Sequence, residues 1–411
     1  MLYLMLIWDV FVVCLWFFDL RRLPRPEQVE VLRLWHDPLG LAEQAQVTLE
    51  AVNHSRVSIS AQIFDEAPET VSAGLPGGEL LSIHAGNSCS LTYAISPSAR
   101  GDAEFHDVWL KYRTAWNLAE RWARARLSQS VRVYPSLREA RKLRLYLIRC
   151  RQIELEKRLK HQRGQGREFE SLREYRSGDE FRDISWKATA RRGKLITKIY
   201  QVERSQTLWL VIDAGRLLRA RINGLAKLDY AINAALGLAQ VALYSGDRVA
   251  LLAYGRKPQQ RVAPNRGSAH LRILLESMAQ VRAEGVEADH MLATEVLLSS
   301  QNRRSLVVWM TDLAETAATP EVIECTAALA KRHLVLFVVM AQNELQNLAL
   351  EGPENVHEMY RQSAAIEILQ RREVLLTRLR RQGALIVQAA PQGISTALAN
   401  KYIEVKERSL L

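Results

Sequence analysis

The segment TLWLVID, residues 207–213, is an almost continuous apolar run that ends in an aspartate. The run SLVVWMTD at residues 305–312 shares this pattern, and HLVLFVVM at 333–340 and ALIVQ at 384–388 are two more apolar runs. Strands of a parallel sheet are covered on both faces, so they read as continuous apolar runs. Helical patterns separate these runs, at residues 227–244, 269–281, 321–331 and 356–381. This alternation predicts a doubly wound, mainly parallel α/β domain.

Upstream of this domain, residues 28–135 show a different pattern. Short runs such as VEVLRLW (29–35) and QVTLEAVN (46–53) alternate apolar and polar side chains, and Gly, Pro, Asn or Asp residues interrupt them. Alternation with period two is typical of strands that have one buried face. Seven short strands of this kind predict an all-β sandwich in front of the α/β domain.

The chain begins with MLYLMLIWDVFVVCLWFF, residues 1–18, which is apolar except for Asp9. As a helix this segment would extend about 27 Å, which is close to the thickness of the hydrocarbon core. Arg21, Arg22 and Arg25 follow it, so the positive-inside rule predicts a single-pass anchor over residues 1–20 in the inner or plasma membrane, with cytoplasmic soluble domains. The alternative is a helix that lies tilted in the membrane interface, with Asp9 at its polar edge.

The formal net charge of +11 is concentrated between residues 136 and 204. Residues 136–166 within this region predict a basic helical linker. Such a charge is compatible with a nucleic-acid-binding protein. However, acidic residues such as Glu154, Glu156 and Glu168 alternate with the basic ones, and we recognise no nucleic-acid-binding module, so we regard nucleic acid as an unlikely partner.

The motifs of common enzyme classes are missing from the sequence. It contains no GxGxxG turn after the first strand of the α/β domain, no GxxxxGK[ST] loop, no HExxH pair and no GxSxG elbow. We therefore expect a protein without enzymatic activity. The alternative is a divalent-metal-dependent phosphoester hydrolase that uses aspartates at the ends of the strands.

Three stretches of the sequence resemble the bacterial domain-of-unknown-function 58 family. They are REFESLREYRSGDEFRDISWKATARRGKLITKIY (167–200), KLDYAINAALGLAQVALYSGDRVALLAY (227–254) and RSLVVWMTDL (304–313). The resemblance covers residues 167–411, and it implies a fold like that of von Willebrand factor type A domains. It also implies a partner, a MoxR-type AAA+ ATPase, and an adaptor role in the maturation or assembly of other proteins.

Type A domains usually bind Mg²⁺ through a DxSxS turn, a threonine from a later loop and a final aspartate. The corresponding positions here are Asp213, Asp289 and Asp312, but the turn reads DAGRL and lacks both serines. The resemblance thus implies a degenerate metal site, with Mg²⁺ as the only candidate cofactor. We hypothesise that an ion pair of Arg216 with Asp312 or Asp289 replaces the metal. The alternative is that these aspartates simply cap strand ends and helix N-termini.

The segment from residue 173 to residue 192 is rich in charge and contains one tryptophan. Gly193 is expected to end a short helix within it in a left-handed conformation, with Trp186 buried. We expect this segment and Arg216 to bind an acidic partner protein or anionic lipid headgroups. The predicted contact residues in the segment are Arg173, Arg176, Asp179, Arg182, Trp186 and Arg191. The alternative is an internal network of salt bridges.

Overall fold

The computed structural model describes residues 2–74, 78, 80–136, 168–176, 179, 181, 184–201, 206–313, 319–408 and 410. The predicted basic helical linker, apart from residue 136, and Arg182 lie outside these residues. The chain divides into two compact units. The first unit contains Met1–Arg138, Arg219–Asn233 and Leu275–Arg282, and the second contains Glu139–Leu218, Ala234–Leu274 and Ala283–Leu411.

The first unit begins with helix α1 (Leu2–Arg22), which is long and apolar enough to cross a membrane. Its last turn is fixed to the rest of the unit through Asp19, whose side chain is fully buried. The Asp19 carboxylate accepts hydrogen bonds from the Thr114 hydroxyl, from Leu118 N at 3.1 Å and from Ala119 N at 2.9 Å. The helix is therefore tied to one loop of the following β-domain.

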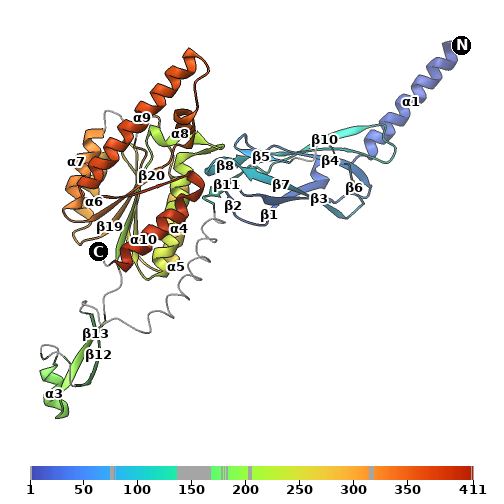
Figure 1. Cartoon of the computed structure of the whole chain (residues 1–411). Helices are drawn as coiled ribbons and strands as arrows, with labels where there is room; N and C mark the ends of the chain where they lie inside the picture. Colours follow the sequence, from blue (N-terminus) through green and yellow to red (C-terminus); the bar gives the residue numbers. More distant parts are fainter. Residues whose placement is uncertain are drawn as a thin grey trace. The chain divides into compact units, whose positions relative to one another are not determined.

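Three sheets form the β-domain, which confirms the predicted β-sandwich in outline (Figure 1). The first contains β1 (Val29–Trp35), β3 (Ala45–Asn53), β7 (Ser88–Pro97) and β5 (Val71–Ala73) in that order. The second contains β10 (Glu120–Ala125), β9 (Val108–Arg113), β4 (Ile59–Asp65) and β6 (Leu81–Ile83). The third contains β2 (Leu39–Gly40), β11 (Gln129–Tyr134) and β8 (Gly101–Phe105). Strand β4 alternates buried and less buried residues along its length, as the period-two pattern predicts.

A charged pair lies within the apolar core of this β-domain. Arg33 Nη2 is 2.5 Å from Asp65 Oδ1, and both side chains are fully buried. The guanidinium also donates to the backbone oxygens of Leu127 and His106, and the Tyr93 hydroxyl donates to Asp65. Burial raises the pKa of Tyr93, and its hydrogen bond to Asp65 acts in the same direction. This network satisfies the two charges inside the core.

The second unit includes an antiparallel hairpin of β12 (Glu168–Glu174) and β13 (Ile196–Gln201) with α3 (Trp186–Arg192) between the strands. Gly193 ends α3 with a φ of 66°, so the predicted left-handed cap is confirmed. Ile184, just before α3, is buried. Trp186 is 66% exposed, so its predicted burial is wrong. Trp186 is the first residue of α3, and no side chain of this helix is buried.

A six-stranded sheet forms the centre of the second unit, with helices on both of its faces (Figure 1). Its strands, in spatial order, are β18 (Pro258–Asn265), β17 (Arg248–Tyr254), β14 (Thr207–Asp213), β19 (Leu306–Met310), β20 (Leu334–Met340) and β21 (Leu385–Ala389). All neighbours are parallel except the β17–β18 pair. The predicted mainly parallel α/β sheet is therefore confirmed.

Two layers of helices cover this sheet. Helices α6 (His290–Ser300), α7 (Thr319–Ala330) and α9 (Val356–Arg381) contribute to a core with Trp209, Trp309 and Phe337 of the sheet. Helices α4 (Lys227–Tyr244) and α10 (Ile394–Glu407) lie on the other side, as Figure 1 shows. The remaining helices are α5 (Ser268–Gln280) and α8 (Asn343–Leu350).

The order of strands along the sheet determines where side chains meet. The first strand of the unit's sheet along the chain, β14, lies between β17 and β19, so the strand order reverses at this point. Ile212 pairs with Met310 in the register of β14 and β19. The carboxyl ends of these two parallel strands therefore lie side by side, where ligands bind in open α/β sheets.

Candidate functional site

Asp213 is the last residue of β14 and is 3% exposed. Its Oδ1 accepts a hydrogen bond from Gly215 N at 2.7 Å, and its Oδ2 accepts one from Thr311 Oγ1 at 2.6 Å. Thr311 follows β19 directly, so this bond links the ends of the two central strands. Burial raises the pKa of Asp213, and the negative charge of Asp312 acts in the same direction.

The turn after β14 is packed tightly against the segment that precedes α6. Arg216 N donates to Val286 O at 2.8 Å, and Glu284 N donates to Ala214 O at 2.7 Å. A Cβ atom at Gly215 would lie 2.8 Å from Ala288 N and 3.0 Å from Asp213 Oδ1. Only glycine therefore fits at this position without a shift of the backbone.

Asp289 has a structural role in this arrangement. It is the N-cap of α6, and its Oδ1 accepts a hydrogen bond from Leu292 N at 2.8 Å. This contact fits the alternative interpretation, in which the aspartate caps a helix N-terminus.

A buried aromatic and histidine network lies next to Asp213. Trp309 Nε1 donates to the Tyr254 hydroxyl at 2.7 Å, and this hydroxyl lies 2.9 Å from His290 Nδ1. The hydroxyl has one proton and two acceptor lone pairs, so it donates to Nδ1 in one tautomer of His290 and accepts from Nδ1–H in the other. Burial lowers the pKa of His290, although the charge of Asp213 opposes this effect. The network therefore favours a neutral imidazole.

The guanidinium of Arg216 binds a different carboxylate from the one predicted. Its Nη2 lies 2.7 Å from Glu287 Oε1, and its Nε lies 3.2 Å from the same atom. The predicted ion pair of Arg216 with Asp312 or Asp289 is therefore wrong. Both partners of the observed pair are exposed, with side-chain exposures of 50% and 38%. The turn that carries Arg216 is joined to the 284–288 segment, which places Glu287 beside the guanidinium.

The predicted Mg²⁺ site can be compared with these contacts. Both Asp213 oxygens accept hydrogen bonds from the protein, and one Asp289 oxygen caps α6. The first serine of a DxSxS turn would stand at Gly215, where a side chain would meet Ala288. Over the described residues, no group of three His, Cys, Asp or Glu side chains is placed to hold a metal ion. The arrangement does not fit a hard cation that needs several free oxygen ligands.

The residues predicted to bind a partner in the 173–192 segment contact one another in part. Arg173 Nη2 lies 2.7 Å from Asp179 Oδ1, and Arg176 N donates to Asp179 Oδ2 at 2.9 Å. These hydrogen bonds, above all the one from Arg176 N, lower the pKa of Asp179. Arg191 is exposed on the last turn of α3, and Trp186 is exposed at its start. The segment therefore combines an internal charge network with exposed groups.

Sequence reasoning missed several residues of this site. Three of them are close in sequence to a predicted aspartate: Thr311 precedes Asp312, His290 follows Asp289, and Glu287 stands two residues before Asp289. The fourth, Tyr254, is the last residue of β17. The doublet Thr311-Asp312 was visible as the end of an apolar run, but only strand order shows that Thr311 faces Asp213.

The fold and the site define a class of protein in which a β-sandwich precedes a mainly parallel α/β domain. The model of a protein family described as "Protein of unknown function DUF58" matches residues 171–384. The chain belongs to this family.

Two relatives among known proteins are themselves uncharacterized. The uncharacterized protein Rv1480 of Mycobacterium tuberculosis is 27% identical over 172 residues, which are 39% of this chain and 54% of the relative. The uncharacterized protein YeaD of Bacillus subtilis is 28% identical over 128 residues, which are 31% of each chain. The matches thus span about half or less of these relatives' own length.

Similar solved structures include a conserved hypothetical protein BatB from Bacteroides thetaiotaomicron. It has a TM-score of 0.31 and 13% identity, and it covers 48% of this chain and 100% of its own. A PapD-like domain of human CEP192 has a TM-score of 0.19 and 15% identity, and it covers 26% of this chain and 87% of its own.

Proposed function

We propose that the chain is a membrane-anchored, non-enzymatic protein-interaction module with a type A-like α/β unit, which acts with a MoxR-type AAA+ ATPase in the maturation or assembly of other proteins. The observation that carries this proposal is the placement of Asp213 and Asp312 at adjacent carboxyl ends of β14 and β19. The strand order of the sheet, with one antiparallel edge strand, supports the type A-like fold. The partner comes from the family resemblance.

The chemistry of the strand ends supports a binding role more than a catalytic one. Asp213 is held by two hydrogen bonds and is almost completely buried, so it is poorly placed to act on a substrate. The groups exposed beside it are Arg216 and Glu287, which form a charged pair on the surface. Exposed charged groups at the edge of an interface contribute specificity and speed of association.

The contacts of α1 support membrane anchoring with the β-domain close to the bilayer. Arg21 and Arg22 lie in the last turn of α1, and the Arg22 guanidinium lies 5.1 Å from the centre of the Trp116 ring. Trp116 is 47% exposed, and its ring lies 5.6 Å from that of Phe18. Arginine and tryptophan side chains gather at membrane interfaces. We propose that the loop around Trp116 lies at the headgroup level, on the cytoplasmic side.

The partner can be tested by crosslinking in native membranes, followed by affinity purification and mass spectrometry. We expect the wild-type chain to recover a MoxR-type ATPase and the Arg216→Ala/Glu287→Ala double variant, which removes the exposed pair of this edge, to recover much less of it. The matched control is Glu324→Gln, which changes an exposed acid on α7 and should leave recovery unchanged. Circular dichroism spectra verify that the variants are folded.

Equal recovery with the double variant would contradict the proposed binding edge. Absence of the ATPase from every sample would contradict the proposed partner. Metal-dependent hydrolysis of a phosphoester by the purified chain, abolished by Asp213→Ala, would support the hydrolase alternative instead.

A further inference from the structure

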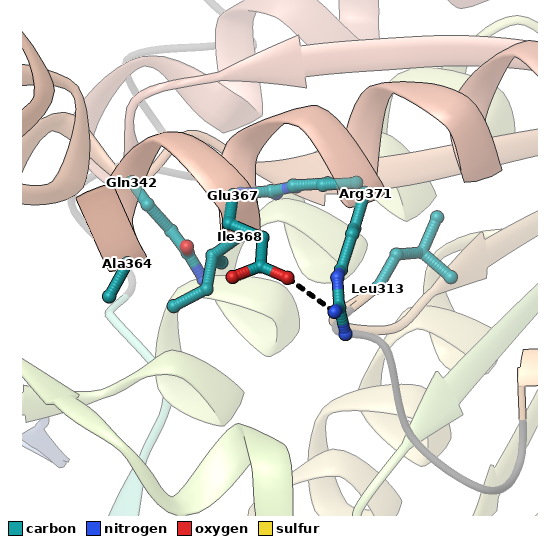
Figure 2. Close-up of a pocket in the computed structure, with 7 residues that line it drawn as sticks. Leu313, Gln342, Ala364, Glu367, Ile368 and Arg371 are labelled. Carbon is teal, nitrogen blue, oxygen red and sulfur yellow. Dashed lines mark hydrogen bonds and ion pairs between the residues drawn. The ribbon is translucent and has the colours of Figure 1, made fainter.

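A pocket in the second unit lies beyond the ends of β19 and β20, next to α9 (Figure 2). It has a volume of about 360 Å³. Leu313 follows β19, Gln342 follows β20, and the other lining residues, Ala364, Glu367, Ile368, Arg371 and Arg372, stand on α9. The pocket is thus separate from the contacts of Asp213 with Gly215 and Thr311.

The buried cation of this pocket is Arg372, which is 5% exposed. Its Nη2 donates to the backbone oxygen of Met340, whereas its Nε and Nη1 have no hydrogen-bond partner. A guanidinium has five N–H donors, and unpaired buried donors are costly. Burial lowers the pKa of Arg372, although Asp312 and Glu373 oppose this effect. These two nitrogens are almost completely buried, and an anion that reached them would satisfy the unpaired donors.

The neighbouring groups restrict the charge of that anion. Arg371 at the rim is already paired with Glu367, as Figure 2 shows. Within the described part of the chain, Arg372 forms no salt bridge. Among the described lining residues, Arg372 is the guanidinium with unpaired donors, and the carboxylates of Glu367 and Asp312 stand nearby. This balance suits a monoanion and disfavours a phosphate dianion.

The remaining lining restricts the shape of the ligand. Leu313, Ala364 and Ile368 provide apolar surface beside the guanidinium. The Gln342 side-chain oxygen has no hydrogen-bond partner, and rotation of its amide would present two N–H donors instead. The pocket thus combines a carboxylate-binding end with an apolar side that fits a short branched alkyl group.

We propose that the Arg372 pocket binds a monocarboxylate that carries a short branched aliphatic group. Such a group occurs in a free aliphatic acid and at the C-terminus of a peptide that ends in leucine or valine. The proposal does not depend on the proposed function, because it uses neither the Asp213 end of the sheet nor an ATPase partner.

The test uses ligand-detected NMR with the full-length chain in detergent micelles. The probes are isovalerate, its neutral isostere isovaleramide, inorganic phosphate, and the peptide acetyl-Gly-Gly-Leu as a free acid and as an amide. For a ligand as small as isovalerate we expect a Kd on the order of 1 mM. Isovaleramide, the peptide amide and phosphate should bind at least about tenfold more weakly than the carboxylates. The stronger of the two carboxylates identifies the source of the group.

Three variants link binding to the pocket. Arg372→Met keeps an unbranched side chain without the charge, and it should abolish binding of isovalerate. Ala364→Trp places a large ring at an exposed position of the lining, away from the Arg372 bond to Met340, and should also abolish binding. The matched control is Val374→Trp, at a position of α9 that is 53% exposed and does not line the pocket. It should bind like the wild type.

Four results would overturn the proposal: no saturable carboxylate binding up to about 10 mM, equal binding of isovaleramide, stronger binding of phosphate, or full binding by Ala364→Trp. Because Ala364→Trp changes an exposed residue, it remains informative even if Arg372→Met fails to fold.

Discussion

The hydrogen bonds of Asp19 join α1 to the β-domain, and their number and type predict how much local opening increases when they are removed. We consider Asp19→Ala, which removes the acceptor for the Thr114 hydroxyl and for the N–H groups of Leu118 and Ala119. A hydrogen bond to a charged group contributes about 1.5–3 kcal/mol. Because each 1.4 kcal/mol changes an equilibrium constant tenfold, local opening at these amides should become roughly 10 to 150 times more frequent.

Hydrogen exchange at single-residue resolution measures this opening directly. In Asp19→Ala, the amides of Leu118 and Ala119 should lose protection by the stated factor. Asp19→Asn keeps one oxygen for these amides, and its NH₂ group can donate to the Thr114 hydroxyl, so its effect should stay below about tenfold. Asp9→Ala changes an exposed aspartate of the same helix and should have no effect on these amides. Unchanged protection of Ala119 in Asp19→Ala would refute the reasoning.

Three further predictions concern the two units. Arg33→Met leaves Asp65 charged and buried, and it should lower the free energy of unfolding by about 3–5 kcal/mol in urea titrations; a smaller loss than about 1 kcal/mol would contradict the network. The raised pKa of Asp213 means that the folded state binds more protons than the unfolded state from about pH 4 upward. Wild-type stability should therefore fall relative to Asp213→Asn as the pH rises through this window, and thermal midpoints at pH 4–7 test the sign. Arg216→Ala removes an exposed pair with Glu287 and should change the free energy of unfolding by less than about 1 kcal/mol, as measured by denaturant midpoints.

Several strands and helices of the α/β unit were predictable from the sequence, because each depends on local patterns, whereas α6, α8 and α10 were not predicted. The apolar run TLWLVID became β14, buried over six of its seven residues, as expected for a strand covered on both faces. Gly193 was predictable as a helix end for the same reason, since the left-handed conformation is a local property.

Pairing of distant side chains was not predictable in this way. Arg216 was expected to bind Asp312 or Asp289, yet it binds Glu287 because the turn after β14 is joined to the 284–288 segment. The exposure of Trp186 also depends on tertiary contacts, since a tryptophan at the start of a helix is buried only if another element covers it. Contacts between residues that are far apart in the sequence depend on the tertiary structure, whereas helix ends and strand patterns can be recognised from neighbouring residues.

The contacts of Asp213 also affect how this edge of the sheet can bind a partner. In type A domains, whose fold the family resemblance implies, a bound metal leaves one position for an acidic partner, but here Gly215 and Thr311 donate to both Asp213 oxygens. An acidic group would therefore need a cation supplied by the chain itself. Arg372 is such a cation, because two of its nitrogens are unpaired in a pocket beyond the same ends of β19 and β20. If carboxylate binding survives Asp213→Asn and is lost in Ala364→Trp, the Arg372 pocket binds the carboxylate without the Asp213 end of the sheet.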